Sequence, residues 1–229
     1  MQENVVNSKL ASSRNTLPPE DWKSNGRPED LGGILSFGAF VRELLSNPRS
    51  IGAALPSSRQ LADRIASFIP DDFHGVLVEL GAGTGAITTG ILERGVHPKQ
   101  VITIERSFPL TQLLKRRFPE ITVLHGGAEY MGDLLATHLA MARPRVDLVI
   151  SSLPLRSLPK HLVAAIGRQV ERCLTEEGRF VQFTYDLRPD VHAPFPRFVK
   201  CESDVVWLNI PPARVDVFER NAWSSYERI

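Results

Sequence analysis

Hydrophobic and polar residues along most of this chain follow two alternating patterns. Short, continuous apolar runs are typical of strands buried on both faces, and they cover residues 76–80, 101–105, 121–124, 146–151 and 179–184. Between them, apolar residues recur three and four positions apart, which predicts helices over residues 86–94, 109–117, 129–140 and 159–174. Strands that alternate with helices in this way indicate an α/β fold whose parallel sheet carries helices on both faces.

The end of the chain breaks this alternation. Residues 204–210 and 214–219 are two strand-like runs, joined by a short link that contains Pro211 and Pro212. They predict an antiparallel hairpin that completes the sheet. The expected fold is therefore Rossmann-like, with seven strands of which most are parallel.

The first part of the chain has a different character. Residues 1–28 are polar and contain several prolines, so we expect a tail that builds no core. Residues 31–45 carry an apolar stripe at helical spacing, and a second helix is expected over residues 59–68. The chain thus divides into a disordered tail, a pair of N-terminal helices and an α/β domain, over residues 1–28, 29–70 and 71–229.

A glycine-rich turn follows the first expected strand of the α/β domain. Glycines are needed there because the backbone turns sharply and a ligand approaches it closely at a helix N-terminus. The spacing G-x-G-x-G, with an acidic residue two positions earlier, resembles that of S-adenosylmethionine (SAM)-dependent methyltransferases. The resemblance implies that Glu79 lies near the amino acid part of SAM, above a turn formed by Gly81, Ala82, Gly83 and Gly85.

The next two strands end in further candidate cofactor residues. Glu105 ends the second strand, where a carboxylate can accept hydrogen bonds from both ribose hydroxyls, and Arg106 follows it. After the third strand, methyltransferases commonly carry an aspartate that binds the adenine amino group. This chain has Ala128 and Glu129 there, so either Glu129 or the local backbone reads the ring. Alternatively, Glu129 is a carboxylate stabilised by a helix N-terminus.

The fourth strand leads into the loop of residues 151–159, at the edge where open α/β sheets bind their ligands. Amino methyltransferases of nucleic acids carry an asparagine and an aromatic ring in this loop, which hold and stack the target base. Ser152 and Leu155 replace them here, while Leu153 and Pro154 keep the Leu-Pro part of the pattern.

Four segments together resemble bacterial phospholipid N-methyltransferases, which methylate phosphatidylethanolamine toward phosphatidylcholine and have relatives that act on ornithine lipids. The segments are residues 47–58, 151–159, 178–185 and 209–215. The resemblance extends over about residues 34–220. It departs from the family at Ser152, where a glycine is usual, and at Asp216, where an aromatic residue is usual.

This resemblance implies a class I methyltransferase that uses SAM and releases S-adenosylhomocysteine. It would methylate the headgroup amine of phosphatidylethanolamine and its methylated intermediates, with ornithine lipid as an alternative acceptor. Backbone carbonyls at Ser151 and Ser152 would accept the amine hydrogens, and Ser151 also borders the cofactor. Leu153 and Pro154 would shape this catalytic loop. The rRNA adenine N6-methyltransferases and a cofactor-binding protein without transferase activity remain as alternatives.

Two residues near the end of the sheet have two interpretations each. Tyr185 ends the fifth strand, where its ring or hydroxyl contacts the methylated nitrogen or simply packs. Arg214 either pairs with the lipid phosphate or braces the hairpin.

The apolar stripe of residues 31–45, which includes Phe37 and Phe40, is a candidate lipid-contacting surface that docks on a membrane. In the other interpretation, the stripe caps the fold. The net charge of +1 is low for a protein that binds structured RNA, so no nucleic acid partner is expected. No metal site is expected. The chain has two cysteines, which are too few for a disulfide framework and fit a cytoplasmic location. No membrane-spanning segment is expected either, so the protein would bind the membrane peripherally.

Overall fold

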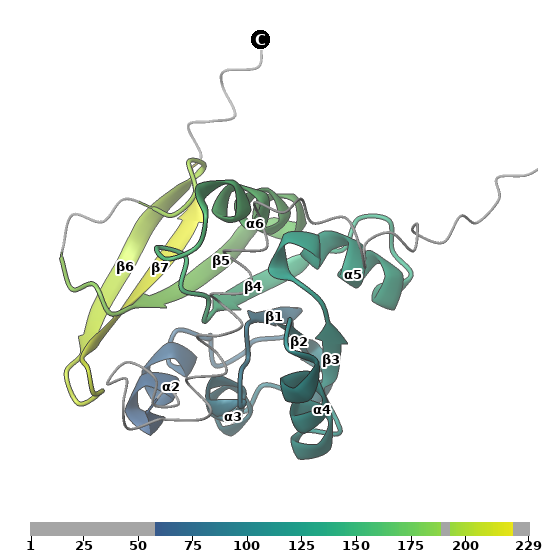
Figure 1. Ribbon diagram of the computed structural model, residues 1–229, viewed down its shortest axis with the longest axis horizontal. Coiled ribbons are helices and arrows are strands. Elements are labelled where there is room, and N and C mark those ends of the chain that lie inside the picture. Colours follow the sequence, from purple (N-terminus) through teal and green to yellow (C-terminus); the bar gives the residue numbers. More distant parts are fainter. Residues whose placement is uncertain (1–57, 189–192, 222–229) are drawn as a thin grey trace, which may run out of the picture. The chain divides into compact units, whose positions relative to one another are not determined.

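A computed structural model describes residues 58–188 and 193–221, all of which belong to one compact unit, Val41–Ile229 (Figure 1). The predicted tail, the predicted helix of residues 31–45 and the candidate lipid contacts Phe37 and Phe40 lie outside the described residues.

Seven strands form one mixed sheet in the order β3-β2-β1-β4-β5-β7-β6. Their bounds are Leu77–Leu80 (β1), Val101–Glu105 (β2), Thr122–His125 (β3), Val146–Ser151 (β4), Leu174–Thr184 (β5), Phe198–Val206 (β6) and Ala213–Arg220 (β7). Strands β1 to β5 pair in parallel, whereas β7 runs antiparallel to both β5 and β6. The prediction of a seven-stranded, mostly parallel sheet closed by an antiparallel hairpin is confirmed.

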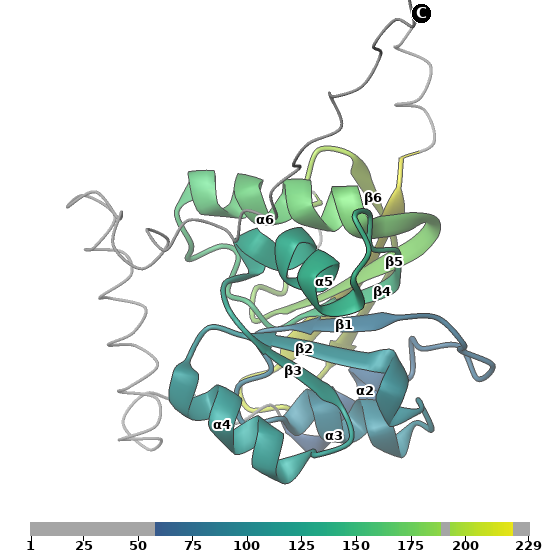
Figure 2. The ribbon, with the colours of Figure 1, turned by 90° about the vertical axis from the view of Figure 1, so that its right-hand side faces the viewer.

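Helices cover both faces of this sheet, as Figure 2 shows. Helices α2, α3 and α4 lie on one face, and α5 and α6 lie on the other. The helices span Arg59–Ala66 (α2), Ala86–Glu93 (α3), Phe108–Arg117 (α4), Met131–Leu139 (α5) and Lys160–Cys173 (α6), with short 3-10 turns at Pro98–Gln100 and Ala128–Tyr130. Among the residues described, no helix is long and apolar enough to cross a bilayer.

The core consists of two apolar clusters, one on each face of the sheet. In β1, Leu77 belongs to the cluster under α2 and α3, while Val78 and Leu80 belong to the cluster under α5 and α6. A strand that is buried on both faces needs apolar residues at successive positions, which explains the continuous apolar runs in the sequence. Helix α2 contributes Leu61 and Ile65 to the first cluster, so it shares the core of the sheet.

The predicted bounds of one strand of the hairpin were wrong. The sequence predicted a strand over residues 204–210, but β6 begins at Phe198 and ends at Val206, and residues 207–212 form the turn to β7. The apolar residues Trp207, Leu208 and Ile210 extended the apparent strand, although all three are exposed in the turn. The sequence prediction therefore took the apolar residues at 207–210 for part of a buried strand, although their side chains face outward.

Candidate active site

The carboxyl end of β1 lies at the point where the strand order reverses, between β2 and β4. Open α/β sheets bind their ligands at such a switch point. The turn after β1 is tied to both neighbours, because the N–H of Gly81 donates to the carbonyl of Ile104 at 2.9 Å and Ser152 donates to the carbonyl of Leu80 at 2.9 Å. The loops that follow β1, β2 and β4 are therefore held together at one edge.

The glycines of this turn adopt left-handed backbone conformations, with φ of +74° at Gly81, +58° at Gly83 and +86° at Gly85. Only glycine enters this region without steric cost. A Cβ at Gly81 would lie 2.8 Å from Cδ2 of Leu153, whereas a Cβ at Gly83 would meet no atom within 4 Å. The turn is thus packed against the β4 loop at Gly81 and open beside Gly83.

Glu79 is fully buried at the end of β1. Its Oε2 accepts a hydrogen bond of 2.6 Å from Thr88, while its Oε1 has no hydrogen-bond partner among the described residues. Burial raises the pKa of Glu79 to about 7; the Thr88 hydrogen bond opposes this shift and the charge of Glu105 adds to it. A buried acceptor without a donor is costly, so this position suits a cationic donor such as an ammonium group.

Glu105 lies at the end of β2 and reaches over the glycine turn. Its Oε2 accepts from the N–H of Gly83 at 3.0 Å, and its Oε1 accepts from the N–H of Ser107 at 2.8 Å. Each carboxylate oxygen can accept a further hydrogen bond. The two oxygens therefore present the paired acceptors that a ribose diol needs.

The loops after β2 and β3 are joined by an ion pair that the sequence did not predict. Arg106 Nη2 lies 3.4 Å from Glu129 Oε1, and Nε2 of His125 lies 3.0 Å from the carbonyl oxygen of Arg106. Ala128 is buried beside Glu129, in the short turn before α5. These candidate adenine-site residues are thus brought together next to Glu105.

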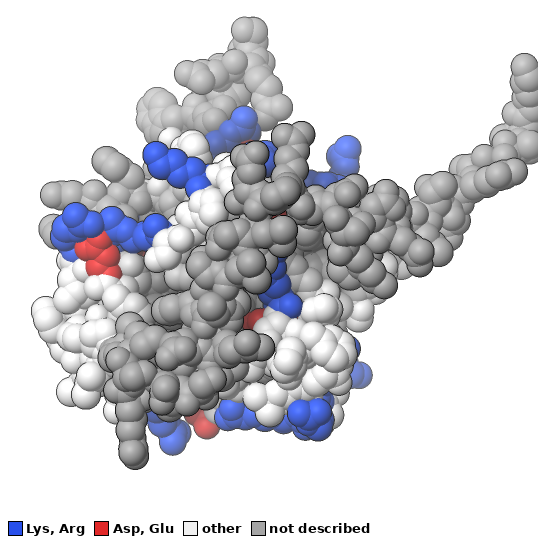
Figure 3. Space-filling model, viewed as in Figure 1, with Lys and Arg blue, Asp and Glu red and all other residues white. Residues whose placement is uncertain are grey.

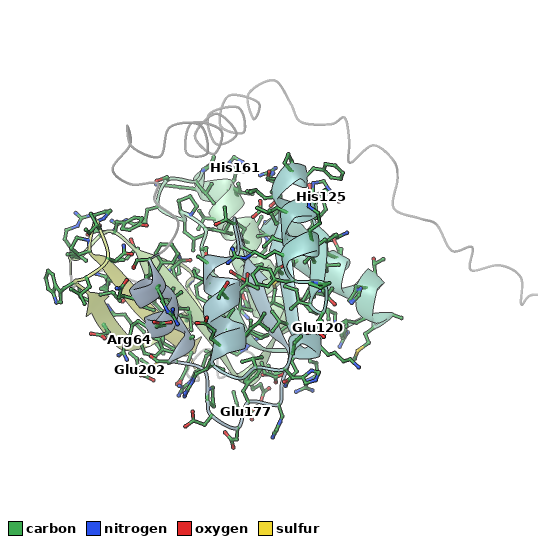
Figure 4. All side chains as sticks on the ribbon, turned by 90° about the horizontal axis from the view of Figure 1, so that it is seen from below. Arg64, Glu120, His125, His161, Glu177 and Glu202 are labelled. Carbon is green, nitrogen blue, oxygen red and sulfur yellow. The ribbon has the colours of Figure 1, made fainter. Side chains whose placement is uncertain are left out.

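The positions of two histidines show which edge of the sheet carries the candidate site. Figure 4 shows His125, which ends β3, and His161, at the start of α6, on the same edge of the sheet. Glu177, near the start of β5, lies at the opposite edge. The carboxyl edge of the sheet therefore carries the candidate site.

The loop after β4 is held by a residue that the sequence analysis missed. Gln182 Nε2 donates to the carbonyl of Leu153 at 3.0 Å, and Ser151 Oγ accepts from the N–H of Leu153 at 3.3 Å. Ser152 Oγ and Gln182 Oε1 are buried without hydrogen-bond partners among the residues described. The β4 loop and β5 thus each contribute a buried polar atom without a partner among the described residues.

Leu155 does not take the place of the aromatic ring found in nucleic-acid amino methyltransferases. It is buried in the apolar cluster under α5 and α6. Pro154 lies between Leu155 and Leu153, and the carbonyl of Leu153 also accepts from the N–H of Leu155 at 2.8 Å. The loop folds back on itself, and the side chain of Leu155 serves packing.

Tyr185 follows β5 directly and is 39% exposed. Its ring packs edge-on against Phe183, with 5.8 Å between centroids. Burial raises the pKa of Tyr185, and the nearby side-chain amide of Asn209 opposes this shift. Asn209 comes from the β6–β7 turn, so Tyr185 lies close to that turn at the carboxyl end of β5.

Arg214 is buried on β7, and its guanidinium is already paired. Its Nη2 lies 2.8 Å from Asp216 Oδ2, and another of its nitrogens donates to the carbonyl of Arg188. Asp216 also accepts from Ser203 Oγ on β6 at 2.7 Å. Of the two roles predicted for Arg214, this geometry favours bracing the hairpin over holding a lipid phosphate. Asp216, which departs from the resembled family, is its partner.

Comparison with known proteins identifies the family. No family model matches the chain. An ornithine lipid N-methyltransferase from Singulisphaera acidiphila is 34% identical over 183 residues, which cover 77% of this chain and 92% of that enzyme. The chain belongs to the same family. It is a SAM-dependent N-methyltransferase.

Two more distant similarities agree with this assignment. A ribosomal RNA small subunit methyltransferase from Arabidopsis thaliana is 30% identical over 133 residues, 57% of this chain but 33% of that enzyme. The crystal structure of 1,6-didemethyltoxoflavin-N1-methyltransferase from Burkholderia thailandensis, with S-adenosylhomocysteine bound, has a TM-score of 0.59 at 14% identity and covers 85% of this methyltransferase and 91% of that chain. The predicted Rossmann-like methyltransferase fold is therefore confirmed.

The described residues fit SAM, the cofactor of this family. The unpartnered Oε1 of Glu79 suits an ammonium group, and the carboxylate of Glu105 suits a ribose. A Cβ at Gly83 would meet no atom of the described residues within 4 Å, so the turn leaves room there for a ligand.

Proposed function

We propose that this methyltransferase transfers methyl groups to the amine of a membrane-lipid headgroup, either ornithine lipid or phosphatidylethanolamine and its methylated intermediates. The observation that carries the proposal is the match over 92% of an ornithine lipid N-methyltransferase. A match of that extent includes the loops that surround the acceptor as well as the cofactor turn.

Three residues hold the cofactor in this proposal. Glu79 binds the ammonium group through Oε1, Glu105 binds the ribose hydroxyls, and Gly83 leaves room for the cofactor beside the turn. When bound, SAM supplies an electrophilic methyl group. In this proposal the cofactor and the amine meet at the carboxyl edge of the sheet, where the β4 loop lies.

The β4 loop receives the amine. An ammonium has no lone pair, so the amine must reach the site without its extra proton. Ser152 Oγ and the backbone carbonyls of Ser151 and Ser152 are acceptors for the remaining hydrogens. Gln182 and Pro154 keep the loop in place. Holding the nitrogen and the methyl carbon in line contributes about 7–11 kcal/mol in favourable cases.

Tyr185 directly follows β5, the strand that pairs with β4 beside this loop. A ring face stabilises a methylated ammonium by about 0.5–2 kcal/mol, depending on exposure. We assign the product nitrogen to this ring. The predicted helix of residues 31–45, with Phe37 and Phe40, completes the proposal as a membrane-docking element that holds the protein peripherally at the bilayer.

Two observations favour lipid over RNA as the acceptor. Leu155 is buried in the core and presents no ring to stack on a base. On the face seen in Figure 3, the Lys and Arg side chains of the described residues stand in small, separate groups. RNA binding usually gathers such charges into a patch or stripe.

The test is incubation of the full chain with methyl-labelled SAM and vesicles that contain either ornithine lipid or phosphatidylethanolamine, with structured ribosomal RNA as a third acceptor. We expect lipid mass to rise in steps of one methyl group, and the vesicle that responds identifies the headgroup. Label in RNA without label in either lipid would overturn the proposal. Glu79→Gln, which cannot present a carboxylate to the ammonium, is the inactive control.

A further inference from the structure

The turn between β6 and β7 presents apolar side chains to the outside. Trp207 is 69% exposed, Leu208 76% and Ile210 75%. The other residues of the turn are Asn209, Pro211 and Pro212, so all six are uncharged. In Figure 3, the corner that holds this turn is an uncharged surface.

The polar residue of the turn points the opposite way. Asn209 is 3% exposed; its Oδ1 accepts from the N–H of Ser58 at 3.2 Å, and its Nδ2 donates to the carbonyl of Pro211 at 2.6 Å. These bonds fix the turn against the N-terminus of α2. The outward position of the apolar side chains is therefore built into the turn, and clustered exposed apolar residues mark an interaction site.

The turn is also connected to the acceptor end of the candidate site. Residue Ala213 pairs with Val206, and Arg214 pairs with Thr184 at the end of β5, so the turn lies at the carboxyl edge of the sheet. Tyr185 follows Thr184 directly. The exposed apolar side chains thus lie at the same edge of the sheet as the ring assigned to the lipid nitrogen.

We propose that this turn is a membrane anchor in which Trp207, Leu208 and Ile210 insert into the interfacial layer of a bilayer. Tryptophan is enriched at that depth because its ring is apolar and its N–H is polar. The inference rests on the proposed function: a lipid amine reaches the β4 loop while its acyl chains stay in the bilayer, so the bilayer must approach this edge. The anchor then holds the headgroup layer beside Tyr185.

Fluorescence of Trp207 provides a direct test. The chain has three tryptophans, so Trp22→Phe with Trp223→Phe leaves Trp207 alone. We expect vesicles of phosphatidylglycerol and phosphatidylcholine, added without SAM, to shift its emission to the blue. Bromine on the acyl chains should quench it most when placed near the headgroup. Emission that does not change with vesicles would overturn the anchor.

A matched control moves the tryptophan elsewhere. Val199 is 44% exposed on β6 and pairs with Glu219, near the opposite end of the hairpin. With all native tryptophans replaced by Phe, Val199→Trp should show neither a blue shift nor quenching. Equal quenching at both positions would indicate unspecific adsorption and would also overturn the proposal.

A second measurement uses the full chain without spectroscopic substitutions. Trp207→Ser with Leu208→Ser and Ile210→Ser should lower the vesicle partition coefficient at least tenfold, and the matched surface variant Met141→Ser with Val199→Ser should not. SAM affinity and the melting temperature should equal those of wild type in both. Wild-type partition in the triple variant would contradict the anchor.

Methylation in detergent micelles separates this inference from the proposed function. Micelles supply the lipid amine without a bilayer, so the triple variant should methylate micellar lipid at the wild-type rate. If wild type methylates no lipid in micelles or vesicles while vesicles still quench Trp207, the proposed function fails and the anchor stands. If lipid is methylated but Trp207 is not quenched, the anchor fails and the function stands.

Discussion

Glu105 accepts a hydrogen bond from the backbone N–H of Gly83 across 3.0 Å, which ties the end of β2 to the glycine turn after β1. The same carboxylate accepts from Ser107 through its other oxygen. One side chain thus sets the distance between the turn and the loop that carries Arg106. This hydrogen bond therefore joins two of the loops that form the candidate cofactor site.

Replacing Glu105 by Gln removes the charge and one acceptor while it keeps the shape. Hydrogen bonds to charged groups contribute about 1.5–3 kcal/mol each, so SAM affinity should fall at least tenfold. Isothermal calorimetry measures this directly. Glu120→Gln, at an exposed position, should bind SAM as wild type does. Unchanged affinity in Glu105→Gln would remove this residue from the cofactor site.

Glu79 gives SAM binding a pH dependence. Its pKa is raised to about 7 by burial, so the carboxyl group is largely protonated below that pH and ionised above it. An ammonium ligand needs the ionised form, so SAM affinity should rise as pH increases through about 7. Calorimetry across this range tests the expectation, and Glu79→Gln should bind weakly with a flat profile.

The stability of the ligand-free protein should follow the opposite course. The folded pKa of Glu79 lies above its ordinary value of 4.5, so the folded state holds this proton more tightly than the unfolded state does. The contribution is fully present below pH 4.5 and is lost as pH rises through about 7. The wild-type free energy of unfolding should decrease over this interval relative to that of Glu79→Gln. A parallel pH dependence of the two proteins would contradict the raised pKa.

Gly81→Ala separates backbone strain from a steric collision. A side chain at φ +74° costs about 1–2 kcal/mol, and the new Cβ would also lie 2.8 Å from Leu153. Gly95→Ala is the matched control, because φ is +97° there and no atom lies within 4 Å. Chemical denaturation should show a larger loss of unfolding free energy for Gly81→Ala than for Gly95→Ala, and in a Leu153→Ala background this difference should disappear. Equal losses of unfolding free energy in Gly81→Ala and Gly95→Ala would show that the β4 loop moves aside without an energetic cost.

Gln182 is expected to act as a positioning residue for the catalytic loop. Gln182→Leu removes the donor to the Leu153 carbonyl and leaves the cofactor contacts in place. We expect kcat to fall about tenfold while the Kd for SAM stays constant. Gln100→Leu is the control. Gln100 likewise donates to backbone carbonyls, those of Phe73 and Gly75, but it precedes β2 at the edge of the sheet opposite the candidate site. A fall in SAM affinity together with kcat would indicate a general structural effect.

The parallel strands were predictable because burial on both faces leaves a continuous apolar run. For β2 the predicted and observed bounds coincide at Val101–Glu105. The start of β5 was missed because Glu176 and Glu177 are exposed there, so this part of the strand lacks the apolar signal. Strands were thus found where both faces are covered, and their ends were lost where they leave the core.

Within the candidate site, contacts between residues close in sequence were predictable, whereas contacts between distant residues were not. Glu79 and the glycine turn lie within a few residues of one another, so their spacing is visible in the sequence. Gln182 contacts Leu153 from 29 residues away, and Asn209 contacts Ser58 from 151 residues away. No local spacing encodes such contacts. In the sequence, Gln182 and Asn209 were visible only as members of the segments 178–185 and 209–215, which resemble the lipid methyltransferases. That resemblance predicted no role for either residue.

The strand order has a consequence for synthesis. Among the strands of the described residues, β6 pairs with β7 alone, and β7 occupies the place between β5 and β6. During translation, β6 therefore leaves the ribosome before it has a neighbour, and β5 remains an open edge that can join strands of other nascent chains. Chains that stop before Ala213 should accumulate as aggregates, because the strand that joins β5 to β6 is made after both of them.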